Sequence, residues 1–216
     1  MARPGPKKSL LQKNLDRDVR AACAHLRGCD PVMATLIDRY GTYRLEARTN
    51  YFQLLMGTVV SQQLSTKAAA SIYARLQENL GTKSPRPGDV LAAREADLRS
   101  AGLSGSKVTY IRNVAEAFAK PHMGPKSFEK RSDSEVTELL TSIKGIGEWS
   151  ADMFLMFALN RMNVFPVGDL GLRNAMVRQY RMRKTGSLRR FHRIAERWQP
   201  YRTVGSLYLW QSYDSV

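Results

Sequence analysis

Apolar residues recur along this chain with the period of an α-helix rather than that of a β-strand. In one stretch they occupy positions i, i+3, i+4, i+7 and i+8, which form one face of a helix: Phe52, Leu55, Met56, Val59 and Val60. The same spacing, with capping residues and breaks, predicts further helices at about 65–80, 91–101, 107–119, 132–143, 148–160, 170–181 and 188–197. Strand-like alternation is confined to short pieces such as "TYRLEA". The pattern predicts an all-α protein.

Prolines and glycines interrupt this pattern at several places. "SPRPGD" (84–89) and "KPHMGPK" (120–126) are expected to be loops. The tightest break lies in "TSIKGIGEWSADMF" (141–154), where Gly145 and Gly147 flank Ile146. Glycines tolerate positive φ, so they allow a close helical hairpin with Ile146 pointing inward. Such a turn is either a structural corner or a binding site for phosphate, because the N–H groups that open a helix lack partners there.

The charge balance favours the phosphate interpretation. The chain of 216 residues has 34 Lys and Arg against 19 Asp and Glu, a net charge of +15 and a pI near 10.2. A nucleic acid is therefore the expected partner, ahead of an anionic membrane surface. Residues 173–202 contain ten basic residues and one acidic residue, Glu196, so this segment is expected to follow phosphates.

Other classes of protein find little support in the sequence. No stretch has the roughly 20 apolar residues that a membrane span needs, and the basic N-terminus lacks the apolar core of a secretion signal. The only cysteines are Cys23 and Cys29, and with His25 they make a trio, whereas a metal site usually takes four ligands. We expect no metal site, a reducing compartment and no secretion.

Several segments together resemble a known family. "LLTSIKGIGEWSADMFLMFAL" followed by "NVFPVGDLGLRNAM" resembles the helix-hairpin-helix motif of the HhH-GPD superfamily of base-excision DNA glycosylases, with its Gly/Pro-rich loop and aspartate. "FQLLMGTVVSQQLSTKAAASI", "AGLSGSKVTYIRNVA" and "WQPYRTVGSLYLW" resemble the branch of 3-methyladenine DNA glycosylase II, the alkyladenine glycosylases. The match runs from about Asp30 to Trp210, in the compact form without a mixed N-terminal domain.

The resemblance implies two helical lobes flanking a cleft that holds the lesion. A basic tail and first helix would occupy residues 1–29, and the glycosylase domain residues 30–216. Lobe one would take about 50–130, and lobe two the N-terminal segment plus about 131–216. The implied activity is base-excision repair: an alkylated purine such as 3-methyladenine or 7-methylguanine is flipped out, and its N-glycosidic bond is hydrolysed to leave an abasic site.

Asp169 stands where the family keeps its catalytic aspartate. Cleavage of an N-glycosidic bond leaves positive charge on the sugar, which a fixed carboxylate stabilises. The alternative is that Asp169 only caps the helix that follows it. Trp149 stands where lyase members of the superfamily carry a lysine, so no Schiff base can form there and a monofunctional glycosylase is expected. A lyase that uses another amine and a non-catalytic or lesion-sensing DNA-binding protein remain the alternatives.

The remaining site residues also follow from the resemblance. Trp210 and Trp149 would stack on the flipped cationic base, with Met153 and Phe154 shaping the pocket; the alternative is that both tryptophans are core residues. Gln63 aligns with the wedge that fills the gap in the base stack. Gln62 would read the opposing base, or both glutamines would pair with backbone groups at their turn. The DNA backbone would be held by Lys144, Gly145, Ile146, Gly147, Lys107 and Ser65, although a surface role for Lys107 is equally open.

Double-stranded DNA containing alkylated bases is the expected partner, with no membrane partner and a monomeric protein. No cofactor is expected to be required, and a monovalent cation at the hairpin is left open. The protein is expected in the cytoplasm or nucleoid of a bacterium, or in the nucleus of a eukaryote.

Overall fold

The computed structural model describes residues 9–48, 50–183 and 187–214, and these residues form helices without any strand. This confirms the all-α prediction. The first eight residues of the predicted basic tail lie outside the described residues. None of the helices in the described ranges is long and apolar enough to cross a bilayer. The helices are α1 (Leu10–Cys29), α2 (Pro31–Tyr40), α3 (Tyr51–Ser61), α4 (Thr66–Asn79), α5 (Pro87–Ala92), α6 (Glu95–Ser100), α7 (Gly105–Phe118), η1 (Pro121–Met123), α8 (Pro125–Glu129), α9 (Asp133–Thr141), α10 (Glu148–Phe157), α11 (Leu170–Gln179), α12 (Arg189–Ala195), η2 (Glu196–Trp198) and α13 (Arg202–Asp214).

The chain divides into two compact units. Unit 1 combines Met1–Ala47 with Asn160–Val216, and unit 2 is the continuous segment Arg48–Leu159. The sequence placed the end of the first lobe near residue 130, but α9 and α10 belong with the helices before them. The reason is that α10 packs on both α3 and α9, and its apolar residues complete the core of unit 2.

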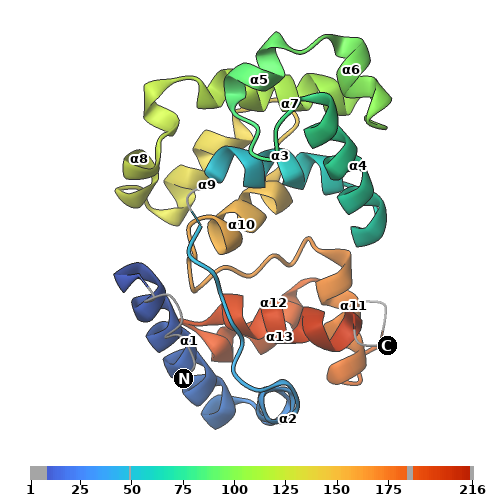
Figure 1. Cartoon of the computed structure of the whole chain (residues 1–216). Helices are drawn as coiled ribbons and strands as arrows, with labels where there is room; N and C mark the ends of the chain where they lie inside the picture. The colour runs from blue at the N-terminus through green and yellow to red at the C-terminus, as the bar shows by residue number, and fades with distance from the viewer. Residues whose placement is uncertain (1–8, 49, 184–186, 215–216) are drawn as a thin grey trace, which may run out of the picture. The chain divides into compact units, whose positions relative to one another are not determined.

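Helix α3 is the centre of unit 2 and packs against α4, α7 and α10 (Figure 1). All five residues of its predicted apolar face are buried, from Phe52 to Val60. Next to them lies an aromatic cluster with neighbouring ring centroids 5.0–6.4 Å apart. Its members are Tyr51, Phe52, Phe118, Phe128 and Phe154. Burial of this much aromatic surface gives unit 2 a rigid core.

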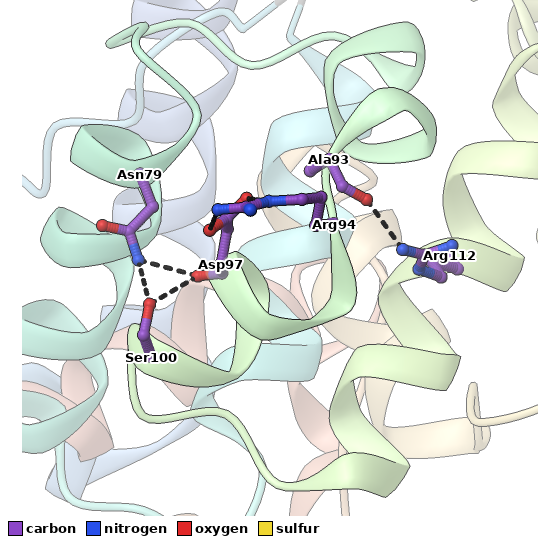
Figure 2. Close-up of polar contacts among 6 residues, drawn as sticks. All are labelled: Asn79, Ala93, Arg94, Asp97, Ser100 and Arg112. Atoms are coloured by element: carbon purple, nitrogen blue, oxygen red, sulfur yellow. Dashed lines mark hydrogen bonds and ion pairs between the residues drawn. The ribbon is translucent and has the colours of Figure 1, made fainter.

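Short helices at one end of unit 2 differ from the prediction. Pro87 starts α5 instead of preventing a helix, because proline is tolerated in the first turn and the Asp89 carboxylate accepts from the Arg86 N–H at 2.7 Å. Helix α6 has a single fully buried leucine and depends on polar contacts (Figure 2). Asn79 donates to the Asp97 carbonyl and to Ser100, at 2.7 and 2.9 Å. Hydrogen bonds from the Arg94 guanidinium hold the pKa of Asp97 below its usual value.

In unit 1, α13 packs against α1, α2 and α11. The buried carboxylate of Asp30 connects α2 to the C-terminal end of α11 and to η2. Its Oδ1 caps α2 by accepting from the Val32 N–H at 2.9 Å. Its Oδ2 accepts from the Tyr180 hydroxyl at 2.8 Å and the Trp198 indole N–H at 3.0 Å. Burial and the charge of Asp30 raise the pKa of Tyr180. This contact joins residues 150 or more positions apart in the chain.

Candidate functional site

Asp169 lies at the N-cap of α11 and is half-buried. Its Oδ1 accepts from the Leu172 N–H at 2.7 Å and from the indole N–H of Trp210 at 2.9 Å. The loop before it is fixed by Arg173, which donates to the carbonyls of Val167 and Gly168, both at 2.9 Å. The side chain therefore caps the helix, as the structural alternative held, and is also held beside an aromatic ring.

Trp210 differs from the core tryptophan of unit 1. Trp198 is completely buried, whereas Trp210 on α13 is half-buried and directs its only polar group to Asp169. A glycine leaves extra room for this approach: a Cβ at Gly171 would lie 3.2 Å from Asp169 Oδ1, a tight contact, and 3.7 Å from Trp210 Nε1, an ordinary one. Sequence reasoning missed Gly171. The signal was present in "GDLGLRN", because a glycine in the first turn of a predicted helix is unfavourable for the helix and so indicates a close contact.

The glycine hairpin joins α9 to α10, and its two glycines have different roles. Gly145 has φ +102°, and a Cβ there would collide with the ring of Tyr110. Gly147 has φ −103°, which any residue adopts, and a Cβ there would meet nothing within 4 Å. The prediction that both glycines make the turn tight is thus wrong for Gly147. Ile146 is buried between them, as expected. Gly147 is also the N-cap of α10, so the first N–H groups of that helix have no side-chain cap.

The side chains of α10 separate into core and partly exposed positions. Phe154 is fully buried in the aromatic cluster, so its predicted place in a base pocket is corrected to the core of unit 2. Met153 is almost completely buried, at 8% exposed, and Trp149 is half-buried in the first turn. The half-buried carboxylate of Asp152 was missed. Burial, together with the nearby charge of Glu148, raises its pKa to about 6. The signal was an acidic residue in the middle of a helix whose other residues after Ser150 are apolar.

The turn between α3 and α4 separates the two glutamines. Gln63 is exposed and has φ 58°, a conformation that costs a residue with a side chain about 1–2 kcal/mol. Gln62 instead donates to the Gly145 carbonyl at 3.1 Å and to Ser150 Oγ at 3.2 Å. Leu64 is 40% exposed beside Gln63, an apolar side chain in a turn that the sequence analysis did not consider. Ser65 caps α4 by accepting from the Ala68 N–H at 3.3 Å. The prediction that a glutamine of this turn pairs with backbone groups is therefore confirmed for Gln62, whereas the side chain of Gln63 is exposed to solvent.

Of the two lysines expected at the DNA backbone, only Lys144 is exposed. Lys107 is half-buried, and its ammonium donates to the carbonyls of Val60 and Gln62 at 2.7 and 2.8 Å. Burial lowers the pKa of Lys107. Its cationic group is thus engaged inside unit 2 instead of being presented to a ligand.

The basic segment 173–202 also divides into structural and exposed residues. Arg173 fixes the loop before Asp169, and Arg202 donates to the side chain and backbone of Asn163 at 2.8 and 2.9 Å. Exposed arginines of this segment that remain for a polyanion are Arg178, Arg181, Arg183, Arg189, Arg193 and Arg197.

A monovalent cation at the hairpin would be held by oxygen atoms of the main chain. Its candidate ligands are main-chain carbonyls, and those of Ile143, Lys144 and Gly145 each accept a hydrogen bond from within unit 2. No step of the mechanism is derived from a cation at this position. Across residues 9–48, 50–183 and 187–214, no cluster of three or more His, Cys, Asp or Glu side chains is arranged for a metal ion.

The glycine hairpin between α9 and α10 leaves a helix N-terminus without a side-chain cap in a strongly basic protein, an arrangement suited to binding a phosphate. Residues 56–200 match the model of the "HhH-GPD superfamily base excision DNA repair protein" family, and the chain belongs to this superfamily.

Individual relatives agree with this placement. The chain is 34% identical over 195 residues to DNA-3-methyladenine glycosylase 1 of Schizosaccharomyces pombe, covering 87% of this chain and 85% of the relative. A solved S. pombe 3-methyladenine DNA glycosylase (Mag1) in complex with abasic DNA superposes with a TM-score of 0.81 at 33% identity, over 90% of this chain and 97% of that one. A DNA-3-methyladenine glycosidase from Bacillus halodurans gives a TM-score of 0.75 at 35% identity, over 89% and 88% of the two chains.

Proposed function

We propose that the protein is a monofunctional DNA glycosylase that removes alkylated purines from double-stranded DNA and leaves an abasic site. The observation that carries the proposal is the contact between Asp169 and Trp210, which places a carboxylate and an aromatic ring side by side. The relatives named DNA-3-methyladenine glycosylase, matched over most of their length, support the same activity.

The chemistry follows from this pair. The bond between the sugar C1′ and the purine nitrogen breaks, and its electron pair leaves with the base. A purine that carries positive charge from alkylation leaves as a neutral molecule, so it needs little help from a general acid. The carboxylate of Asp169 stabilises the charge left on the sugar, and a water molecule adds to C1′ and loses a proton. The hydrogen bonds from Leu172 and Trp210 hold the carboxylate in place throughout.

Trp210 contributes the face of its ring. Stacking and cation–π attraction hold a flipped cationic purine, at roughly 1–3 kcal/mol per stacked base. Since the indole N–H is bonded to Asp169, the orientation of the ring and that of the carboxylate are set together. The preferred lesions are therefore cationic purines such as 3-methyladenine and 7-methylguanine.

The absence of a lyase step rests on Trp149. This residue occupies the first turn of α10, at the position that would carry the amine in a lyase. An indole cannot form a Schiff base with the sugar, so strand cleavage has no covalent route there.

DNA is held by the hairpin in this proposal. The first N–H groups of α10 have no side-chain cap, and the space around the Gly147 Cα is open, so we infer that a phosphate oxygen binds at this helix N-terminus. Lys144 adds an exposed positive charge beside it. Gln63 is the wedge that enters the base stack, because Gln62 is occupied inside unit 2. The protein acts as a monomer, at the DNA of the cytoplasm or nucleus.

The experiment is base release from methylated duplex DNA by the wild-type protein and by Asp169→Asn, with abasic sites scored before and after alkali. The expected result is release by the wild type alone, with strand breaks only after alkali. Equal release by both proteins would remove Asp169 from the mechanism. Breaks before alkali would indicate a lyase. Tight DNA binding without any release would identify a lesion-sensing binding protein.

A further inference from the structure

The two loops of unit 2 expected at DNA are supported by one helix, α7. The first is the turn after α3, residues 62–65, here called the wedge turn. The second is the glycine hairpin, residues 144–147. Helix α7 contacts the wedge turn through Lys107 and the hairpin through Asn113, which donates to the Lys144 carbonyl at 2.9 Å, and through Tyr110, whose ring fills the space beside Gly145.

Lys107 is placed unfavourably for its own helix. It lies in the first turn of α7, where its N–H is bonded to the capping Ser104 Oγ at 3.3 Å. The positive end of the helix dipole lies there, so a lysine at this position is repelled. The same ammonium lies at the C-terminal end of α3, whose last residue is Ser61 and whose C-cap is Gln62. A cation is favoured there, because it meets the negative end of the dipole and satisfies carbonyls left without helical partners.

The carbonyls that Lys107 binds determine the geometry of the wedge turn. Gln62 directly precedes Gln63, the residue with positive φ, and Val60 lies three positions before it in the last turn of α3. A strained conformation persists only where its surroundings fix it. The side chain of Gln62 continues the chain of contacts by donating to Gly145 in the hairpin. The wedge turn and the hairpin are thus joined by a continuous series of hydrogen bonds.

We propose that Lys107 is a positioning residue, which holds the wedge turn in register with the hairpin through the Val60 and Gln62 carbonyls and does not bind a DNA phosphate. This inference rests on the proposed function, since it assigns the wedge turn to base flipping. Lys107 contributes to excision by keeping Gln63 in its strained, outward conformation. It contributes little to the electrostatic attraction of DNA.

The test separates the two roles by the salt dependence of binding. A lysine that neutralises one phosphate contributes about 0.9 to the slope of log K against log salt concentration. Binding to a duplex with an abasic-site analogue is measured over a range of salt for the wild type, Lys107→Met and Lys144→Met. Lys83→Met, at an exposed lysine between α4 and α5, is the matched control. We expect the slope to fall by about 0.9 for Lys144→Met and to be unchanged for Lys107→Met and Lys83→Met.

Excision is then measured with saturating enzyme in a single turnover, with 2-aminopurine beside the lesion to report flipping. Lys107→Met leaves two carbonyls without their donor, so we expect the excision rate and the fluorescence change on flipping to fall about tenfold. The Lys144→Met protein should reach the wild-type excision rate once its concentration is high enough to saturate the DNA, because only its affinity is reduced. If Lys107→Met does not fold, Lys107→Gln removes the charge but keeps a donor, and its salt slope then decides the question: an unchanged slope supports the proposal, and a fall of about 0.9 overturns it.

A slope that falls for the Lys107 variant as much as for Lys144→Met, with normal excision at saturation, would overturn the proposal. So would wild-type slope, excision and flipping in a folded Lys107→Met protein, which lacks any donor to these carbonyls. If the wild type binds DNA but releases no base, the proposed function fails. The salt slopes and the flipping signal still decide the role of Lys107, because neither needs turnover.

Discussion

The two hairpin glycines make a matched pair of substitutions, because the structure gives each a different reason to lack a side chain. At Gly145 the positive φ costs alanine about 1–2 kcal/mol, and forcing a methyl group into the ring of Tyr110 costs about 1–3 kcal/mol more. The sum is about 2–5 kcal/mol. At roughly 2–4 °C per kcal/mol for a chain of this length, Gly145→Ala should lower Tm by about 4–20 °C.

At Gly147 the same substitution should hardly change stability. Alanine gains about 0.4–1 kcal/mol from the smaller entropy of the unfolded chain, and it loses a similar amount because it is a poorer N-cap than glycine. The open space around the position adds no clash. What changes is access, because a methyl group keeps a phosphate from the N–H groups of α10. Loss of a hydrogen bond to a charged group costs about 1.5–3 kcal/mol, so DNA affinity should fall about tenfold to a hundredfold.

Thermal unfolding followed by circular dichroism gives Tm, and fluorescence anisotropy with a labelled duplex gives Kd. A large drop in Tm for Gly147→Ala would show that the glycine is needed for the turn itself. Unchanged Tm and unchanged Kd for Gly147→Ala together would refute the argument that its open space admits a phosphate.

Two further substitutions test the electrostatics of the site. Trp210→Phe keeps an aromatic face but removes the donor to Asp169, so single-turnover excision should fall about tenfold while affinity for undamaged DNA stays the same; equal loss of both would show only that α13 is disrupted. The pKa of Asp152 is raised to about 6 in the folded protein. Between about pH 4 and 6 the folded state therefore binds more protons than the unfolded state, and the free energy of unfolding that Asp152 contributes falls as pH rises through that range. Asp152→Asn should therefore be more stable than the wild type at pH 7 and equal to it at pH 4, as measured by urea unfolding; a constant difference at both pH values would mean that the titration of this carboxyl is not the cause.

Local patterns in the sequence were sufficient for much of this structure. The face of α3 from Phe52 to Val60 follows from helical spacing alone. The cap formed by Asp169 was one of the two interpretations that the sequence offered for this residue, because aspartate is common at the N-cap. The apolar pattern of α10 correctly indicated burial. It could not show that its partner would be α3, and this is why the lobe boundary was placed some 30 residues too early.

The errors at individual site residues have the same origin. Phe154 is in the core because of rings that come from three other segments, and nothing near it in the sequence indicates them. Lys107 is engaged by carbonyls 45 and 47 positions away, so on the sequence alone it was indistinguishable from a surface lysine. Trp210 lies 41 positions from Asp169, and only the family resemblance related the two. Contacts between residues far apart in the sequence thus determine whether each of these side chains lies in the core or in the candidate site.

The division of unit 1 between two segments has a consequence for synthesis. Unit 2 is continuous, so a nascent chain that has emerged as far as residue 159 contains all of it, including the glycine hairpin. Unit 1 cannot be completed until the C-terminal residues have been synthesised. Asp30 accepts a hydrogen bond from Trp198, and the Tyr43 N–H donates to the Tyr208 hydroxyl. Domains generally fold as units, the earlier part first, during translation. The Asp169–Trp210 pair is therefore completed only after unit 2, so a chain interrupted near residue 159 would contain the proposed contact with the DNA backbone but not the proposed catalytic aspartate.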